Sequence, residues 1–291
     1  MVSGRRKRLD LTTPGLLGLP LAWLVVFFIV PIGIVGAYSL DVFSIYPGKH
    51  PVTWSGWDDF FHSAIYLKLF WKSVRLSLLV SVIVVLLAYP VAYFLALSGT
   101  KRKYVLLLIL IAPFLTSYLL RVLAWKVILG SNGVLNSFLF WTGVRSHDDP
   151  ISQLLYSKFA VVLVLIYVWL PFVALPIFVS LESLDRRLLE AATDLGATRW
   201  QAFLRVTLPL SAPGIIAAFL FVFIPTVGEF VTPSLVGGTS GYMYGNQISD
   251  LFSTGFPDWR TGSVLALFLL AVVAVLTGVF SRFLGMRQPT A

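Results

Sequence analysis

Hydrophobic residues in this chain form long uninterrupted runs, and the alternation typical of barrel strands is absent from them. Six stretches contain no charged residue: 11–40, 76–100, 104–120, 159–181, 206–228 and 261–281. A helix needs about 20 apolar residues to cross the hydrocarbon core of a bilayer, and these runs are long enough. The pattern therefore predicts an all-α integral membrane protein with six transmembrane helices. The predicted spans cover residues 16–38, 76–97, 104–123, 159–181, 207–228 and 261–281.

Two further stretches, 127–144 and 230–249, also lack charge. Both contain several glycines, and the second also contains Pro233. We expect both to be irregular or partly re-entrant, because non-helical backbone at membrane depth is tolerated only beside protein or water. The alternative that one of them is a true span stays open.

The composition agrees with a membrane protein. Of the 291 residues 58% are hydrophobic and only 12% are charged, and the mean hydropathy is +0.88. A soluble domain has about a quarter of its residues charged, so much of this surface must face lipid. The chain has no cysteine, which excludes disulfides and thiolate metal sites.

The net charge of +9 comes mainly from one side of the predicted membrane topology. With both termini on that side, it receives thirteen of the 22 lysines and arginines, and its net charge is +8 against +1 for the other side. The positive-inside rule then places both termini in the cytoplasm. The basic excess reflects topology, so no nucleic-acid partner is expected.

A basic cluster at residues 5–8 precedes the first apolar run. This order is also found in secretory signal peptides, so a signal peptide is the alternative to a first span. The apolar run is much longer than the 7–15 residues of a signal peptide, which favours an uncleaved first span.

Residues 182–205 form a substantial polar segment on the predicted cytoplasmic side. Leucine and alanine recur at helical spacing from Leu184 to Leu195, and Gly196 then stands where a helix end needs a left-handed residue. Thr198 and Gln201 form a plausible capping box for a second short helix. The segment is predicted to fold as helix, tight bend and helix before the fifth span.

This segment resembles the EAA signature of ABC importer permeases. Glu190-Ala191-Ala192 is followed after three residues by Gly196, and after nine more by Val206-Thr207-Leu208-Pro209. All fixed positions of the signature match except Val206, where isoleucine is usual. The resemblance covers nearly the whole chain and implies the type I ABC importer permease fold. It also implies that the protein lies in the bacterial cytoplasmic (inner) membrane.

The resemblance implies that residues 182–205 couple the permease to a separate ATPase. Small alanines allow close approach of another surface, apolar side chains provide anchors, and Glu190 provides a charged contact or a cap. The candidate coupling residues are Glu190, Ala191, Ala192, Gly196, Leu188, Leu195 and Trp200. The alternative is an amphipathic helix lying on the membrane surface, which would not require Leu208-Pro209 at a fixed distance.

Two other segments resemble polyamine permeases. Residues 120–136 are similar to the third-span exit of that group, and residues 228–238, with Met243 and Gly245, are similar to the fifth-to-sixth-span segment of spermidine/putrescine permeases. The long loop after the first span suits the first of their two permease subunits. Ser234 departs from the pattern, because some polyamine permeases have an acidic residue there. Relatives with this pattern are also associated with opines and other small solutes, so an amino-acid-like compound or an inorganic ion stays open.

A polycation crossing the membrane is stabilised by carboxylates and aromatic faces along its path. Glu229, at the end of the fifth span, is the best-placed candidate, with capping of a helix or pairing with Arg121 or Arg260 as alternatives. The candidate path residues are Glu229, Asp250, Tyr242, Trp125 and Trp169. The two tryptophans also fit simple interfacial positions.

The chain has no phosphate loop ending in Gly-Lys-Ser/Thr, so we expect it not to hydrolyse ATP and to carry no cofactor. Its three histidines, His50, His62 and His147, lack metal-ligand spacing, so no metal site is expected. A stand-alone secondary transporter and an intramembrane enzyme are the alternatives from other classes, and charge-free spans argue against both.

The resemblance further implies the partners of the chain. They are two ABC ATPase subunits carrying ATP and Mg²⁺, a second and different permease subunit, and an external solute-binding protein. Membrane lipid surrounds the assembly.

Overall fold

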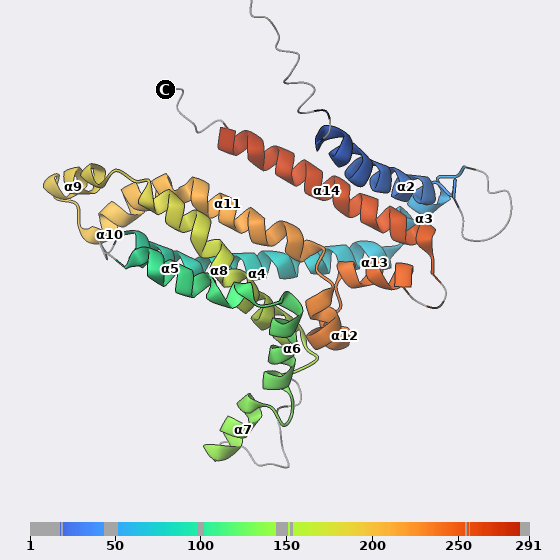
Figure 1. Cartoon of the computed structure of the whole chain (residues 1–291), viewed down its shortest axis with the longest axis horizontal. Coiled ribbons are helices and arrows are strands. Elements are labelled where there is room, and N and C mark those ends of the chain that lie inside the picture. The colour runs from blue at the N-terminus through green and yellow to red at the C-terminus, as the bar shows by residue number, and fades with distance from the viewer. Residues whose placement is uncertain are drawn as a thin grey trace, which may run out of the picture. The chain divides into compact units, whose positions relative to one another are not determined.

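The computed structural model describes residues 18, 20–43, 52–97, 102–143, 151, 154–253, 255 and 257–285. All regular structure in these residues is helical (Figure 1). The basic cluster at residues 5–8 lies outside the described part of the chain. Contacts divide the chain into two compact units, residues 1–63 with 251–272 and residues 64–250 with 273–291.

The first unit contains the π-helical turn η1 (Val25–Ile29), α2 (Val30–Ser39), α3 (Ser55–His62) and the first part of α14 (Trp259–Gly285). The fully buried ring of Phe60 packs on Phe268, with ring centroids 4.7 Å apart. Arg260 binds Asp59 through a 3.2 Å ion pair. These contacts join α3 to α14 within this unit.

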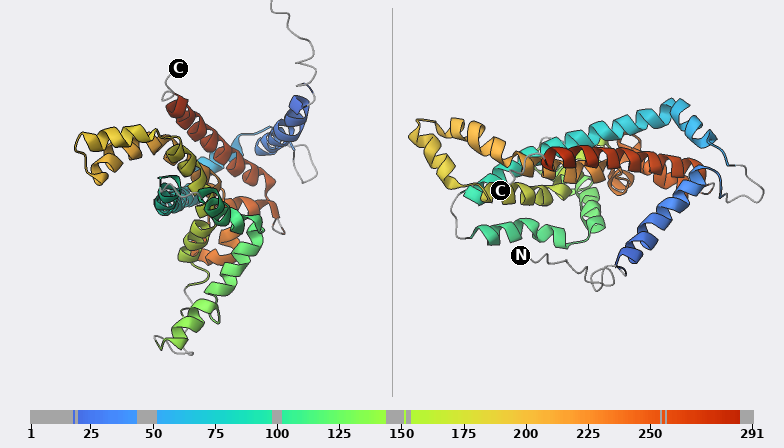
Figure 2. Two further views of the ribbon diagram at one scale, coloured as in Figure 1. Left: turned by 60° about the vertical axis from the view of Figure 1, so that its left-hand side comes forward. Right: turned by 90° about the horizontal axis from the view of Figure 1, so that it is seen from above.

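The second unit is built around three long helices: α4 (Ala64–Leu97), α8 (Lys158–Glu182) and α11 (Leu208–Val227). They pack against one another along their lengths (Figure 2). The remaining elements of the unit are α5 (Lys103–Ile111), η2 (Ala112–Leu115), α6 (Tyr118–Leu129), α7 (Val134–Trp141), α9 (Arg186–Asp194), α10 (Arg199–Ala202), η3 (Phe203–Thr207), η4 (Pro233–Gly237), α12 (Gly238–Gly241) and most of α13 (Tyr244–Ser253).

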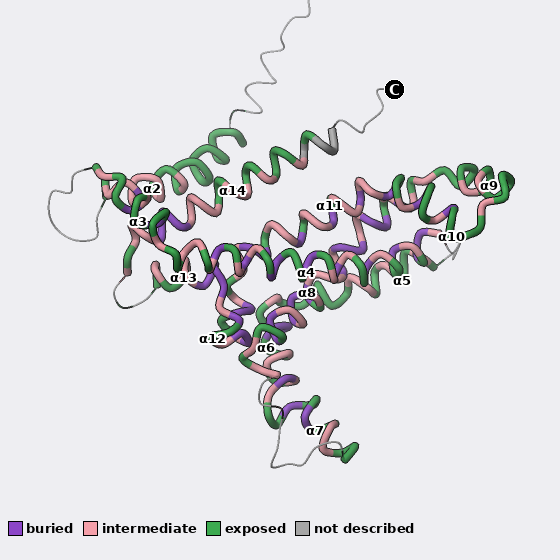
Figure 3. Tube along the Cα trace, turned by 180° about the vertical axis from the view of Figure 1, so that it is seen from behind, coloured by how far each residue is buried: buried purple, intermediate pink, exposed green. Residues whose placement is uncertain are grey.

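Small residues let the three long helices approach closely. Val80, Val84, Ala88 and Ala92 lie at four-residue spacing on α4 and are fully buried. A Cβ atom placed on Gly214 of α11 would lie 2.4 Å from the Cβ of Ser180 on α8, so only glycine fits this crossing. Small residues are typical of helix interfaces in membranes, where packing rather than water exclusion drives association. Buried residues concentrate along these helices, and large apolar side chains on their other faces are exposed, as lipid contact requires (Figure 3).

Six helical segments of the described residues are long and apolar enough to cross a membrane, in agreement with the predicted number. They are Pro20–Ser39, Ala64–Leu97, Tyr118–Trp141, Lys158–Glu182, Arg199–Val227 and Trp259–Phe280. The second and fifth are longer than expected, because α4 begins twelve residues before the charge-free run and α10 continues into α11.

The predicted continuous helix at 104–123 is wrong in its bounds. The carbonyl of Pro113 accepts hydrogen bonds from the backbone N–H of Thr116 at 3.3 Å and from its hydroxyl at 2.6 Å. Thr116 and Ser117 then have extended ψ angles of 152° and 137°, which end one helix before α6 begins.

Much of the stretch 127–144, expected to be irregular, is also helical, because α6 continues to Leu129 and α7 follows a short turn. The apolar helix Lys103–Leu115 is too short to count among the six. Which of these segments crosses the bilayer stays a prediction.

Candidate functional site

The polar segment between α8 and α11 folds as helix, bend and helix, as its sequence predicts. We call residues 182–207 the elbow. Asp185 caps α9, since its carboxylate accepts the N–H of Arg187 at 3.0 Å. Thr198 and Gln201 make the reciprocal capping box that starts α10.

Gly196 makes the bend. Its φ angle is +82°, a left-handed conformation that costs other residues about 1–2 kcal/mol. Its N–H donates to the carbonyl of Thr193 at 2.9 Å, and the N–H of Ala197 donates to the carbonyl of Ala192 at 3.0 Å. These two bonds are the Schellman arrangement that ends many helices. No atom lies within 4 Å of a Cβ placed on Gly196, so the backbone angle and not space selects glycine.

Both ends of the elbow are fixed to the long helices. Glu182 pairs with Lys103 and accepts the hydroxyl of Tyr104 at 3.0 Å, which joins the end of α8 to α5. At the other end the ring of Phe203 packs edge-on against Tyr89 of α4 at 5.9 Å. The elbow is therefore a structured projection with anchored ends.

A π-helical turn, η3, connects α10 to α11. Proline at position 209 has no N–H to donate to the carbonyl four residues earlier, and its ring crowds that carbonyl. The wider turn directly before Pro209 accommodates both effects.

Between its anchored ends the elbow exposes apolar side chains. No residue of α9 is buried, and the exposed fractions are 48% for Leu188, 89% for Leu195 and 66% for Trp200. The carboxylate of Glu190 forms no ion pair or hydrogen bond with the described residues, and Ala191 is exposed next to it. Trp200 also stacks on Phe203 at 5.3 Å, so its ring is partly fixed. The structure thus carries the predicted coupling residues on one projecting element, the elbow (Figure 1).

The predicted path residues fall into separate clusters. Glu229 is half-buried and its Oε1 accepts the N–H of Thr232 at 3.0 Å, so it caps the turn that leads to η4. The hydroxyl of Thr232 lies 2.5 Å from that of Tyr118 on α6. Helix capping was one of the two alternatives for Glu229, and no ion pair joins it to Arg121 in the described residues.

Tyr242 and Asp250 form the second cluster. The phenol of Tyr242 donates to Oδ2 of Asp250 at 2.7 Å. Burial, together with this hydrogen bond to a carboxylate, holds the pKa of the Tyr242 phenol above its ordinary value. Within the described residues no hydrogen bond or ion pair connects this cluster to Glu229.

The two tryptophans make different contacts. Trp125 packs edge-on against Tyr167 at 5.4 Å and lines a hollow of about 330 Å³ on the α6 side. Trp169 packs against Phe172 and Phe221. Its buried indole N–H has no hydrogen-bond partner in the described residues.

Arg121, not selected as a site residue, lies in the same hollow as Trp125. Only 6% of it is exposed, its buried Nε has no partner among the described residues, and its guanidinium lies 5.3 Å from the ring of Phe114. Its sequence signal was a single charge at the end of the apolar run 104–120.

A fold of long apolar helices with one capped, exposed elbow defines a membrane-embedded permease. The comparisons agree: residues 64–288 match the family described as "Binding-protein-dependent transport system inner membrane component". The chain belongs to this family and is a transport subunit, a multi-pass protein of the inner membrane.

Curated relatives include the spermidine/putrescine transport system permease protein PotB of Haemophilus influenzae, which is 36% identical over 90% of both chains. PotB of Escherichia coli K12 is 38% identical over 75% of this chain and 78% of its own. Among solved structures, a bacterial ABC transporter involved in the import of the acidic polysaccharide alginate matches with a TM-score of 0.66. That match has 19% identity and covers 96% of this chain and 98% of the other, so it supports the fold.

Proposed function

We propose that this chain is a permease subunit of an ATP-driven importer whose solute is a small polycation of the spermidine or putrescine type. The observation that carries the proposal is the 36% identity to the Haemophilus influenzae spermidine/putrescine permease over 90% of both chains. A polycation also suits the half-buried carboxylate of Glu229 and the Tyr242–Asp250 pair.

Both termini lie in the cytoplasm in this proposal. The support is the distribution of basic residues, +8 on the side of the termini against +1 on the other. With six spans, the elbow follows the fourth and is then cytoplasmic as well. The N-terminal ends of α4 and α8, at Ala64 and Lys158, then face the exterior.

The elbow docks on an ATPase subunit that supplies ATP and Mg²⁺. Its exposed apolar side chains, Leu188, Leu195 and Trp200, are the anchors, and Glu190 is an unpaired charge available to the partner. An external binding protein delivers the solute, and a second permease chain completes the pore with two ATPase subunits. ATP binding shifts the equilibrium between inward- and outward-facing states only if the ATPase binds them with different affinities.

Uptake into proteoliposomes tests the proposal. The chain is reconstituted with its partner permease, ATPase and external binding protein, and labelled spermidine and putrescine are compared with an amino acid and molybdate. We expect ATP-dependent accumulation of the polyamines alone. Accumulation of another solute in their place contradicts the solute assignment, and full transport by this chain without an ATPase contradicts the importer mechanism.

Glu229→Gln tests the proposed path. An amide oxygen still accepts the N–H of Thr232, so the substitution removes the charge and keeps the cap. We expect uptake to fall about tenfold or more, since one charge contact at membrane depth contributes about 1–3 kcal/mol. The control is Asp58→Asn, the same acid-to-amide change at an exposed carboxylate of α3. Uptake at the unchanged rate with Glu229→Gln removes Glu229 from the path.

A further inference from the structure

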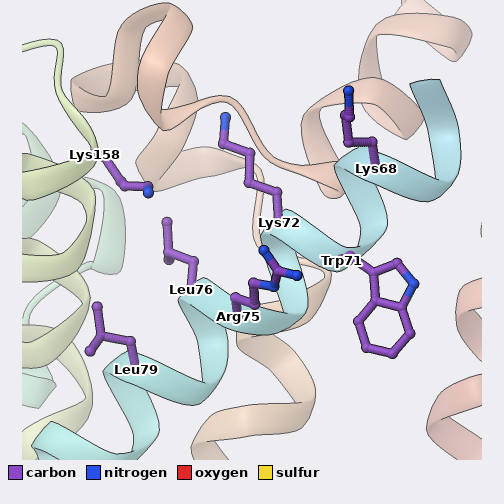
Figure 4. A pocket seen from close by; sticks show the side chains of 7 residues that line it. All are labelled: Lys68, Trp71, Lys72, Arg75, Leu76, Leu79 and Lys158. Carbon is purple, nitrogen blue, oxygen red and sulfur yellow. The ribbon is translucent and has the colours of Figure 1, made fainter. Parts of the chain in front are cut away.

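A hollow of about 620 Å³ lies beside the first turns of α4 and the start of α8. It is lined by Lys68, Trp71, Lys72, Arg75, Leu76, Leu79 and Lys158 (Figure 4). Four of these seven side chains are cationic. The α4 members recur at helical spacing, so they form one stripe, and Lys158 reaches the hollow from the start of α8.

Among the described residues, no ion pair neutralises the four cations. Within the part of the chain that the structure describes, none of them has a carboxylate at ion-pair distance. Lys72 donates one hydrogen bond, to the carbonyl of Tyr242 at 2.7 Å, which fixes its amine at the edge of the hollow. Four like charges in one hollow repel one another, so an anion bound there would be strongly favoured.

On the proposed topology, the hollow lies at the boundary between the lipid headgroups and the hydrocarbon. With its 34 residues α4 is about 51 Å long, well beyond the roughly 30 Å of hydrocarbon. Its charge-free part begins at Leu76, so Lys68, Lys72 and Arg75 lie at headgroup depth and Leu79 lies in hydrocarbon. Trp71, 57% exposed, occupies the interfacial level typical of tryptophan.

We propose that this hollow binds an anionic phospholipid. The lysines and Arg75 bind the phosphate and any further headgroup charge, while Leu79, with 49% of its surface exposed, contacts an acyl chain. Arginine and lysine at an interface are strong phosphate ligands, and each contributes about 1 kcal/mol near a membrane surface. A free anion would use the cations but would gain nothing from the apolar lower wall. The site is independent of which solute the transporter moves, and a polycationic solute is repelled from it.

Native mass spectrometry of the assembled transporter tests this site with two probes, phosphatidylglycerol and phosphatidylcholine. We expect phosphatidylglycerol to bind more tightly to the wild-type complex. In the double variant Lys68→Gln/Arg75→Gln, we expect its dissociation constant to rise about 30-fold, from two lost cation contacts. Lys126→Gln is the matched control, because this α6 lysine lies over the ring of Tyr156 and outside the hollow. An unchanged melting temperature of the double variant shows that the fold is intact.

Three outcomes overturn the proposal. The first is equal binding of phosphatidylglycerol to the wild type and the double variant. The second is displacement of the lipid by inorganic phosphate at a similar concentration, which would make the site a phosphate site with no part for the acyl chains. The third is a double variant that binds lipid as the wild type does but, in phosphatidylcholine nanodiscs, binds the external binding protein more weakly. The cations would then bind an acidic surface of that protein.

Discussion

The elbow and the segment 228–250 are both interruptions of an apolar helical protein, yet they are stabilised in opposite ways. Between its anchored ends the elbow is held by hydrogen bonds between residues two to five positions apart, and no residue of α9 is buried. In segment 228–250, Met243 and Tyr244 are fully buried, and Tyr244 donates its N–H to Ser73 of α4 at 2.7 Å across 171 positions. One region keeps its shape through local backbone chemistry and leaves its surface free for a partner. The other keeps its shape through the surrounding helices.

The dense packing of segment 228–250 can be tested with the same substitution at a glycine inside it and at one outside it. A Cβ atom on Gly245 would lie 2.4 Å from the carbonyl oxygen of Gly228, so alanine must displace backbone. We expect Gly245→Ala to cost about 3 kcal/mol, as overpacking in a core does, and to lower the melting temperature of the purified protein strongly. Gly33→Ala is the control, since a Cβ there meets nothing within 4 Å. Equal melting temperatures for the two variants would mean that residues 228 and 245 do not pack together.

Asn246 links three parts of segment 228–250. Its side chain donates to the carbonyl of Phe230 at 3.0 Å and to the hydroxyl of Ser234 at 2.7 Å, and it accepts the N–H of Met243 at 3.0 Å. At about 1 kcal/mol for each bond, Asn246→Ala should reduce the free energy of unfolding by about 2–3 kcal/mol. Thermal unfolding measures the loss, with Gln247→Ala as the one-bond control. A loss no larger than that of the control contradicts a structural role for Asn246.

What could be predicted from the sequence follows the same division. The bend at Gly196 and the cap at Thr198 depend on residues close in the chain, so their positions were predictable and the structure confirms them. The bond from Lys72 to Tyr242 spans 170 positions, and a single sequence holds no local signal for it.

The bounds of the third helix failed for a different reason. Charge-free length was used to mark spans, but Arg121 is buried among aromatic rings near the start of α6, and its charge ends no helix. The helix ends earlier, where Thr116 binds the carbonyl of Pro113 with both its backbone and its hydroxyl. The sequence signal for this helix end was Pro113 together with Thr116 and Ser117, three and four positions later.

At the elbow, Gly196→Ala should cost about 1 kcal/mol, because it strains one left-handed residue and meets no neighbour. The effect should stay local: amide hydrogen exchange rises in residues 186–197 while the melting temperature of the whole protein is kept. Gly196→Asn is the control, since asparagine tolerates the left-handed region better than alanine. A fall in global stability as large as that of Gly245→Ala would contradict local stabilisation of the elbow.

The smallest effect on stability is expected from Leu195→Ser. With 89% of its surface exposed, Leu195 contributes little to the fold, and the change in unfolding free energy should stay within about 0.5 kcal/mol. If Leu195 anchors the ATPase, the same variant should retain less ATPase on co-purification, and uptake should fall. Val179→Ser is the matched control: it changes an exposed apolar residue of α8 outside the elbow. Normal ATPase retention by Leu195→Ser would contradict docking of the ATPase on the exposed face of the elbow. Loss of the ATPase from Leu195→Ser but not from Val179→Ser would show that this residue is dispensable for the fold and essential to the assembly.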